Sequence, residues 1–460
     1  MIRTSWHQIA LYGALTMLQK GLGFILLPIT TRYLSVAEYG TLELIIITLT
    51  LASLFEISAG ALPKLAADSK QGLLATAVKL SSGYGLLVAL ACLALIAVNP
   101  VQIYHAVTWY QGSLIAVCVW LMMMLYPVQV WLRIQNRADH YCMVVAAQTL
   151  TQAVGTLSAL FLGWGIDGIL MASVAANLTA LVIGLYLLRT QWRLPMCRQL
   201  IGQIVSYQSS LIGASLALFV MYGLDRMVIS HWLGAETLAH YGIMLKLTEA
   251  IAVGFAVFEL WWGPKRYELA QSKAGQARIV VVHQVVLVLL MASLLIVCAI
   301  AEPILRWLLP AEYLLGLAWL PALLIMLGFR LATSVLDFGC YTQQRPIWLP
   351  RINAAFAAMA IGLYMWVVPI WSIEGLLLAN VVVYGTRLVV FSWVSQRIFK
   401  LDYPMLSMVV SMTMCCLCLA SWGWLPSWIS LLIAAFWLLT TMMLMLRRYA
   451  SPPDRNSALN

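Results

Sequence analysis

The sequence has few charged residues. Only 10% of its 460 residues are charged, whereas 63% are hydrophobic. Soluble globular domains contain about 25% charged residues, so too few charges are present to cover the surface of a soluble fold of this length. This shortage excludes a soluble enzyme, a nucleic-acid-binding protein and a disordered chain. The composition instead indicates an all-α, polytopic membrane protein.

The usual marks of catalytic and metal sites are also missing. The chain has no Gly-rich phosphate loop, no nucleophile motif with a plausible base, and no metal-ligand spacing between its nine cysteines and its histidines. Every segment that we place outside the membrane is short. We therefore expect no enzymatic activity, no metal or other cofactor, and no nucleic-acid partner.

Long apolar runs take up most of the chain. A membrane-spanning helix needs about 20 apolar residues. Fourteen runs meet this requirement, and the seventh is the least distinct because Asp225 and Arg226 interrupt it. The first contains Lys20 and no small-residue cleavage site, so we interpret it as a retained helix rather than a signal peptide. The runs cover residues 8–31, 39–62, 73–98, 112–132, 141–163, 166–188, 206–232, 239–262, 279–301, 314–337, 348–370, 373–396, 405–422 and 427–446.

Basic residues fall almost entirely on one side of these runs. With the N-terminus in the cytoplasm, twenty of the 27 lysines and arginines lie in cytoplasmic segments. The outer loops hold only Arg32 and Arg306. Because cytoplasmic loops of membrane proteins are enriched in Lys and Arg, this split predicts that both termini are cytoplasmic.

The second half of the sequence repeats motifs of the first. Three motif pairs recur in the same order, at offsets of 202, 208 and 207 residues. They are Tyr39-Gly40 with Tyr241-Gly242, Gln135-Asn136-Arg137 with Gln343-Gln344-Arg345, and Ile166-Asp167-Gly168 with Ile373-Glu374-Gly375. We interpret the Tyr-Gly and Ile-acid-Gly pairs as helix-entry and packing devices.

Six helices per repeat is an even number, so the two copies have the same orientation in the membrane. The predicted parts are an N-terminal six-helix lobe (1–190), a cytoplasmic linker (191–205), a C-terminal six-helix lobe (206–400), and two additional helices with a cytoplasmic tail (401–460).

Five basic residues are predicted inside helices. Each such charge costs roughly 2.5–3.5 kcal/mol on insertion scales, so its side chain is expected to face protein or water. For Lys20 two interpretations stay open: a role in a cavity, or an ion pair with Glu43, Glu56 or Glu249. The five residues are Lys20, Arg226, Lys246, Arg330 and Arg387.

The other four basic residues have structural alternatives. Arg226 is either an anchor near the outer surface or a cavity residue. Lys246 and Glu249 are three residues apart on one predicted helix, a spacing at which they neutralise each other. Arg330 and Arg387 lie toward cytoplasmic helix ends, where their long side chains are expected to reach the membrane surface.

Two segments resemble a known family. The first, residues 22–64, contains Gly23-Phe24, Pro28, the run 32–40 and Pro63-Lys64. The second begins with Gly223-Leu224-Asp225-Arg226 and continues through Leu233-Gly234 to Tyr241-Gly242. Both are similar to the polysaccharide transport family of the multidrug/oligosaccharidyl-lipid/polysaccharide exporter superfamily, which includes the O-antigen and capsule-repeat flippases.

The resemblance implies a two-lobe transporter of the cell inner membrane that works by alternating access. Its cargo would be a polyprenyl-pyrophosphate-linked oligosaccharide of lipopolysaccharide or other polysaccharide biosynthesis. The implied partners are this lipid-linked glycan, membrane lipids, and the polymerase and chain-length proteins of the same pathway.

The resemblance also implies site residues. Basic residues of the central cavity would hold the pyrophosphate, which points to Lys20, Arg226 and Lys246, with Arg32 as a further substrate-binding candidate. Carboxylates that could carry a coupling ion are Glu249, Asp225 and Glu56. Helix two departs from the family pattern, since it supplies only the acids Glu43 and Glu56.

Three other functions remain open. Fourteen helices are compatible with a lipid II-type flippase. A multidrug or cation antiporter of the same superfamily needs an acidic cavity, for which Glu249 and Glu259 are available; Lys20 favours an anionic cargo instead. A membrane enzyme or scaffold of envelope polysaccharide assembly is the alternative from a different class, although such enzymes generally need a large external loop.

Overall fold

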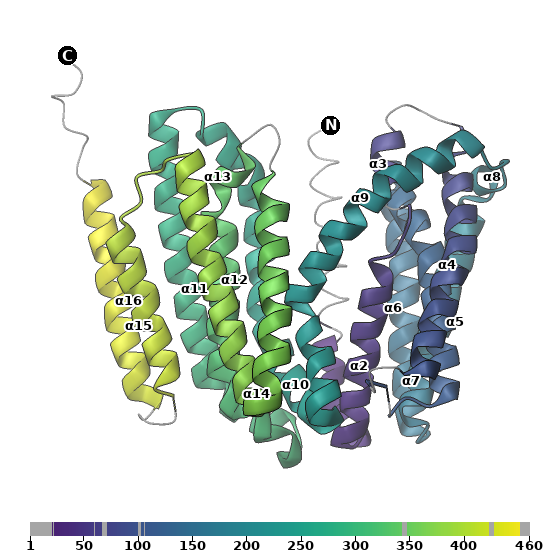
Figure 1. The fold of residues 1–460 in the computed structure, drawn as a ribbon, viewed down its shortest axis with the longest axis horizontal. Coiled ribbons are helices and arrows are strands. Elements are labelled where there is room, and N and C mark those ends of the chain that lie inside the picture. The colour runs from purple at the N-terminus through teal and green to yellow at the C-terminus, as the bar shows by residue number, and fades with distance from the viewer. Residues whose placement is uncertain are drawn as a thin grey trace. The chain divides into compact units, whose positions relative to one another are not determined.

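The computed structural model describes residues 21, 23–58, 60–66, 71–99, 103–104, 106–342, 347–422 and 427–450 (Figure 1). These residues form helices and connecting segments, and no β-strand occurs among them. The predicted all-α class is therefore confirmed.

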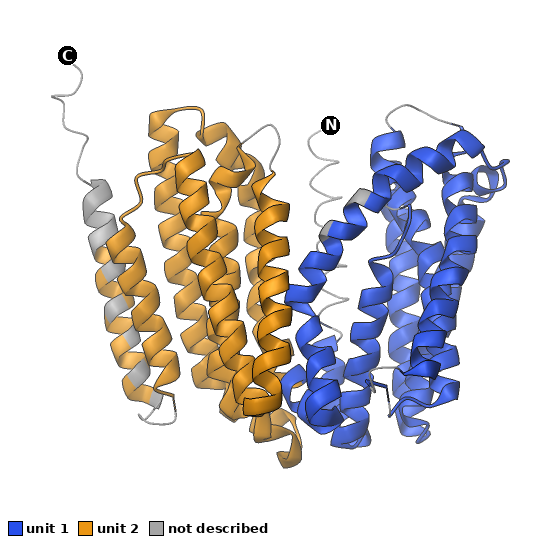
Figure 2. Ribbon diagram, in the orientation of Figure 1, with its two compact units in different colours: residues 1–242 blue, residues 243–460 orange. Residues whose placement is uncertain are grey.

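The chain folds as two compact units, residues 1–242 and 243–460 (Figure 2). The first unit contains a helix at 23–33 and the start of α10. It also contains α2 (Val36–Ser53), α3 (Ala61–Ala66), α4 (Leu73–Val98), α5 (Trp109–Ile134), α6 (Ala138–Phe161), α7 (Gly165–Leu187), α8 (Arg189–Trp192) and α9 (Arg198–Tyr222).

The second unit contains most of α10 (Leu224–Leu269), a helix that is kinked at Gly234. It continues with α11 (Lys273–Leu308), η1 (Ala311–Trp319), α12 (Leu320–Leu336), α13 (Phe338–Tyr341), α14 (Trp348–Ile398), α15 (Met405–Ala420) and α16 (Ser427–Ala450). The predicted limits of the lobes stay a prediction, although α9 begins at Arg198, inside the expected linker.

Nine helices of the described part of the chain are long and apolar enough to cross a membrane, and two shorter apolar helices follow at Met405–Ala420 and Leu431–Thr440. The 51-residue α14 is too long for one crossing, because about 20 helical residues already span a bilayer core. It is broken at Ser372. The polytopic fold is confirmed, whereas the total of fourteen spans is not.

Capping side chains fix the starts of two helices in the first unit. The Ser35 side chain accepts a hydrogen bond from the Glu38 amide, and the Glu38 side chain accepts one from the Ser35 amide, so α2 begins with a capping box. Thr108 and Gln111 form the same arrangement at the start of α5. These side chains bind amides that have no partner within the helix.

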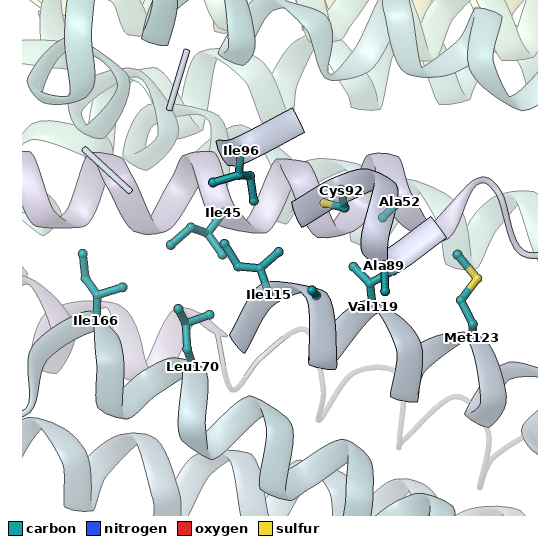
Figure 3. Close-up of a cluster of buried hydrophobic side chains, with 11 residues drawn as sticks. Ile45, Ala52, Ala89, Cys92, Ile96, Ile115, Val119, Met123, Ile166 and Leu170 are labelled. Carbon is teal, nitrogen blue, oxygen red and sulfur yellow. The ribbon is translucent and has the colours of Figure 1, made fainter. Parts of the chain in front are cut away.

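The core of the first unit is built by α2, α4, α5 and α7. Figure 3 shows the apolar side chains that meet there, with Ile45 from α2 and Ile115 from α5 at the centre. Both side chains are buried. Large apolar residues elsewhere, such as Leu87 and Val154, are exposed. Such exposure fits a chain whose outer surface is covered by lipid.

Two glycines bring α2 and α10 together in the first unit. A Cβ atom at Gly40 would lie 1.7 Å from the Ala235 carbonyl oxygen, and one at Gly242 would lie 2.9 Å from the Glu43 side chain. Only hydrogen fits at these contacts. The predicted packing role of the two Tyr-Gly pairs is therefore confirmed.

The two Ile-acid-Gly motifs are each preceded by a residue with the same positive φ. Gly165 and Ser372, which directly precede them, both have φ of 53°. In each motif the glycine packs on a tryptophan Cβ: a Cβ at Gly168 would lie 2.8 Å from that of Trp164, and one at Gly375 would lie 3.0 Å from that of Trp371. The motif pair thus shares local geometry as well as sequence.

Candidate functional site

The second apolar run is not one continuous helix. The sequence predicts a helix over 39–62, but α2 ends at Ser53 and α3 begins only at Ala61, so this prediction is wrong for its last third. Figure 1 shows α2 and α3 as separate helices. A break inside a membrane frees backbone N–H and C=O groups, which must find partners in protein or water. Such breaks in transporters form binding sites.

A buried carboxylate lies at this break. Glu56 is only 4% exposed. Its Oε1 accepts hydrogen bonds from the Ser58 amide at 2.9 Å, the Ser58 hydroxyl at 2.6 Å and the Ser81 hydroxyl of α4 at 3.3 Å. The two hydroxyls are 3.0 Å apart. Three side-chain oxygens from two helical regions therefore meet at one point.

Helix α9 also contacts the break between α2 and α3. Gln208 is 8% exposed, and its Oε1 has no hydrogen-bond partner among the described residues. A Cβ at Gly60, inside the break, would lie 2.6 Å from this oxygen. Next to it, the Lys64 Nζ of α3 lies 4.5 Å from the centre of the Tyr207 ring. Two successive residues of α9 therefore contact the break and the helix that follows it.

Sequence reasoning identified Glu56 but not its neighbours. Ser81 follows it by 25 residues and Gln208 by 152, so no local spacing connects them. A signal for the break itself was present. Ser58 and Gly60 follow Glu56 closely, and Ser and Gly are less favourable in helix interiors than Leu or Met.

Asp225 joins the two segments of α10 on either side of the kink at Gly234. It is buried, its Oδ2 accepts a hydrogen bond from the Tyr241 hydroxyl at 2.5 Å, and its Oδ1 accepts one from the Arg226 amide at 2.9 Å. Arg226 is half-buried, and its Nε has no partner in the described part of the chain. The two neighbours therefore differ: the carboxylate is satisfied locally, while the guanidinium keeps an unused donor.

Glu249 forms an ion pair in the second unit. Its Oε1 lies 3.0 Å from a terminal nitrogen of Arg330, which comes from α12. Glu249 therefore pairs with Arg330 and not with Lys246, the neighbour that sequence spacing favoured. Lys246 is half-buried.

The expectation that Arg387 reaches the membrane surface is wrong, whereas for Arg330 it stays a prediction. Arg330 is held by Glu249, while Arg387 is buried and donates two hydrogen bonds to the Asn353 Oδ1, at 3.0 and 3.2 Å. In both cases a partner within the second unit satisfies the guanidinium.

Two predicted site residues lie near the N-terminus. Lys20 lies outside the described residues, so its two interpretations remain as predicted. Arg32 is exposed in the last turn of the helix 23–33.

Asp337 is a buried acid that the sequence analysis did not single out. It directly follows the span Ala311–Leu336 and is 6% exposed. Burial raises the pKa of this carboxyl from 3.8 to about 7, although the charges of Arg266 and Arg387 oppose that rise. Its Oδ1 has no hydrogen-bond partner among the residues that the structure describes.

This raised pKa predicts a pH-dependent stability. Because folded Asp337 binds its proton more tightly than the unfolded chain does, its contribution to stability is present below pH 3.8 and is lost as the pH rises through about 7. The Asp337→Asn variant should have a flatter profile of unfolding temperature against pH in this window. Asp402→Asn, at an exposed position, is the control and should keep the wild-type profile. Identical profiles for Asp337→Asn and wild type would contradict the prediction.

Comparisons with solved structures identify the fold. The chain is similar to a structure described as "Lipid II flippase MurJ, inward closed conformation", with a TM-score of 0.69 and 11% identity over 96% of this chain and 100% of that one. It is also similar to inward-facing and outward-facing structures of a multidrug resistance MATE family transporter of the MOP superfamily. Their TM-scores are 0.57 and 0.54, at 11% and 13% identity, over 84% and 85% of this chain and 94% of each of theirs. At these identities the likeness concerns the fold alone.

Sequence comparison identifies the family. No curated protein matches the chain significantly in sequence. The family model described as "Polysaccharide biosynthesis protein" matches residues 5–259, more than half of the chain and including both segments on which the resemblance was based. The chain therefore belongs to the polysaccharide biosynthesis protein family.

Proposed function

We propose that the protein is a flippase that moves a polyprenyl-pyrophosphate-linked oligosaccharide across the inner membrane by alternating access. The glycan would be an O-antigen or other surface polysaccharide repeat unit. Membership of a polysaccharide biosynthesis family supports a glycan cargo. The fold, which is similar to those of a flippase and of transporters, supports a transport function rather than catalysis.

The observation that carries the transport part is the buried carboxylate at a broken membrane helix. A charge in the membrane is costly and typically marks an ion or substrate pathway. Glu56 is buried at this break and accepts hydrogen bonds from the hydroxyls of Ser58 and Ser81, so it matches this description. We assign Glu56 to ion coupling. Asp225 and Glu249 are proposed for the same role, although Arg330 balances the charge of Glu249.

Basic residues support an anionic head group. Charge-assisted hydrogen bonds from guanidinium and ammonium groups suit phosphate oxygens. Arg226 has a donor that no described residue uses, and we assign it to the pyrophosphate. Lys20 and Lys246 are proposed beside it. The polyprenyl tail can stay in lipid during transport, so only the polar head needs a path through the protein.

A lipid II-type cargo is the second candidate. Similarity to the lipid II flippase structure extends over 96% of this chain, whereas the two MATE comparisons cover 84% and 85%. Lipid II and a polysaccharide repeat unit share the polyprenyl pyrophosphate, so the same basic residues would serve either cargo.

The test is translocation of a defined cargo by the purified protein. Proteoliposomes containing the full chain receive a fluorescent polyprenyl-pyrophosphate oligosaccharide, and an impermeant quencher reports the fraction that has crossed. We expect protein-dependent translocation that falls at least tenfold in Arg226→Ala and is partly retained in Arg226→Lys. Arg306→Ala, which removes an exposed arginine paired with Glu302, is the matched control and should be neutral.

Two results would overturn this proposal. One is the absence of translocation by the wild-type protein while it exports a cationic drug. The other is full activity of Arg226→Ala, which would remove the residue from cargo binding.

A further inference from the structure

One buried oxygen at the helix break is left unpaired. Native proteins provide nearly every buried polar atom with a partner, because burial without one is costly. Gln208 is more than nine-tenths buried, yet its Oε1 has no donor among the described residues. This oxygen lies directly over Gly60, at 2.6 Å from where a Cβ would be. An unpaired buried acceptor at a helix break calls for a partner, which is either a hydrogen-bond donor or a cation.

The surrounding groups are also oxygens. The Glu56 carboxylate and the hydroxyls of Ser58 and Ser81 are separated from one another by 2.6–3.3 Å. Both hydroxyls and the Ser58 amide already direct their interactions to this carboxylate, and they leave no donor for Gln208. Carboxylate, hydroxyl and amide carbonyl oxygens are the ligands that hard cations prefer. Interrupted membrane helices commonly supply such cation sites.

We propose that the break in helix two is a binding site for a small monovalent cation of the size of Na⁺. Its ligands are Glu56, Ser58 and Ser81 on one side and the Gln208 carbonyl of α9 on the other. Only one of the four ligands is a carboxylate, whereas a divalent ion would normally be bound by more acidic ligands. The cation site itself does not depend on the proposed function. Only the assignment of this cation as the coupling ion for transport rests on it.

The site connects two elements that are far apart in the sequence. Residues 54–60 belong to the region between α2 and α3, while Gln208 lies in the middle of α9. An ion bound by both would hold α9 against the break. Ion release would free α9 from this contact. Binding and release of the cation would therefore change how firmly α9, which leads into α10, is held at the break.

Thermal unfolding of the purified full-length protein tests the inference without any cargo. Unfolding temperatures are measured in NaCl, KCl and choline chloride at equal ionic strength. A ligand that binds only the folded state raises its stability. We expect NaCl to raise the unfolding temperature of the wild type above its value in choline chloride, with a smaller rise in KCl.

Three variants separate this site from a general salt effect. Gln208→Leu removes the unpaired acceptor, so its unfolding temperature in choline chloride should equal or exceed that of the wild type, while its response to NaCl should fall at least fivefold. Gly60→Ala places a methyl group against Gln208 and should also lose the response. Gly83→Ala is the matched control, since a Cβ there meets nothing within 4 Å, and it should respond as the wild type does. Ser81→Ala provides a second ligand variant.

Several outcomes would overturn the cation site. One is an equal unfolding temperature of the wild type in NaCl and in choline chloride. Another is a rise in NaCl that is unchanged in both Gln208→Leu and Ser81→Ala. A water molecule would then be the partner of Gln208. Glycan translocation by a protein with no NaCl response would refute this inference and leave the flippase intact. A specific NaCl response in a protein that does not move the glycan would support the site and refute the cargo.

Discussion

Glu56→Gln should abolish transport while leaving the protein folded. The amide has nearly the same shape as the carboxylate, and its carbonyl oxygen can still accept hydrogen bonds from Ser58. It lacks the negative charge that ion coupling needs, so we expect glycan translocation to fall at least tenfold, which corresponds to about 1.4 kcal/mol or more. Translocation and the yield of folded protein are measured on the same preparation.

Glu38→Gln is the control for this variant. It makes the same change of residue type in the same unit, but Glu38 is exposed and serves the capping box of α2. Its transport should stay close to that of the wild type. Full transport by Glu56→Gln at a normal yield would show that the buried charge is structural.

Gly40→Ala should strongly destabilise the first unit. The new Cβ would lie 1.7 Å from the Ala235 carbonyl oxygen and 2.5 Å from its carbon, and these are backbone atoms that cannot rotate away. Inserting a methylene into a packed interior costs about 1–3 kcal/mol, and we expect the upper end or more because helices α2 and α10 must separate. The measurement is the yield of folded protein together with its unfolding temperature in detergent.

Gly362→Ala is the control for the loss of stability expected in Gly40→Ala. It introduces the same methyl group on α14, at a position where a Cβ meets nothing within 4 Å. Because Ala favours helices more than Gly, this variant should be neutral or slightly more stable. A Gly40→Ala protein as stable as Gly362→Ala would mean that α2 and α10 do not pack through this glycine.

The fold class was predictable because long apolar runs and the distribution of charged residues between them identify membrane helices without any knowledge of tertiary contacts. The number of spans was harder, since it depends on breaks. The turn at Ser372 arises from a single backbone angle, and α2 ends at Ser53 although the apolar sequence continues beyond it. An apolar window has the same composition on both sides of such a break.

The site was predictable only in part, because its contacts are tertiary. Glu56 stands out in an apolar run, but its partners come from α4 and α9. Glu249 shows the opposite problem. Its spacing to Lys246 satisfies the local rule for helix neighbours, yet a residue 81 positions away provides the ion pair. Local spacing states which pairs can form, and packing decides which of them do.

The shared φ of 53° at Gly165 and Ser372 bears on how the two halves have diverged. Glycine adopts this conformation freely, whereas a residue with a Cβ does so rarely and under strain. If both segments descend from one duplicated ancestor, the positive φ was kept in the second copy although glycine, the residue that suits it best, was not. In that case the residue at position 372 changed to Ser while the backbone kept the same φ. Searches for distant paralogues of such chains should therefore weigh turn geometry above residue identity at this position.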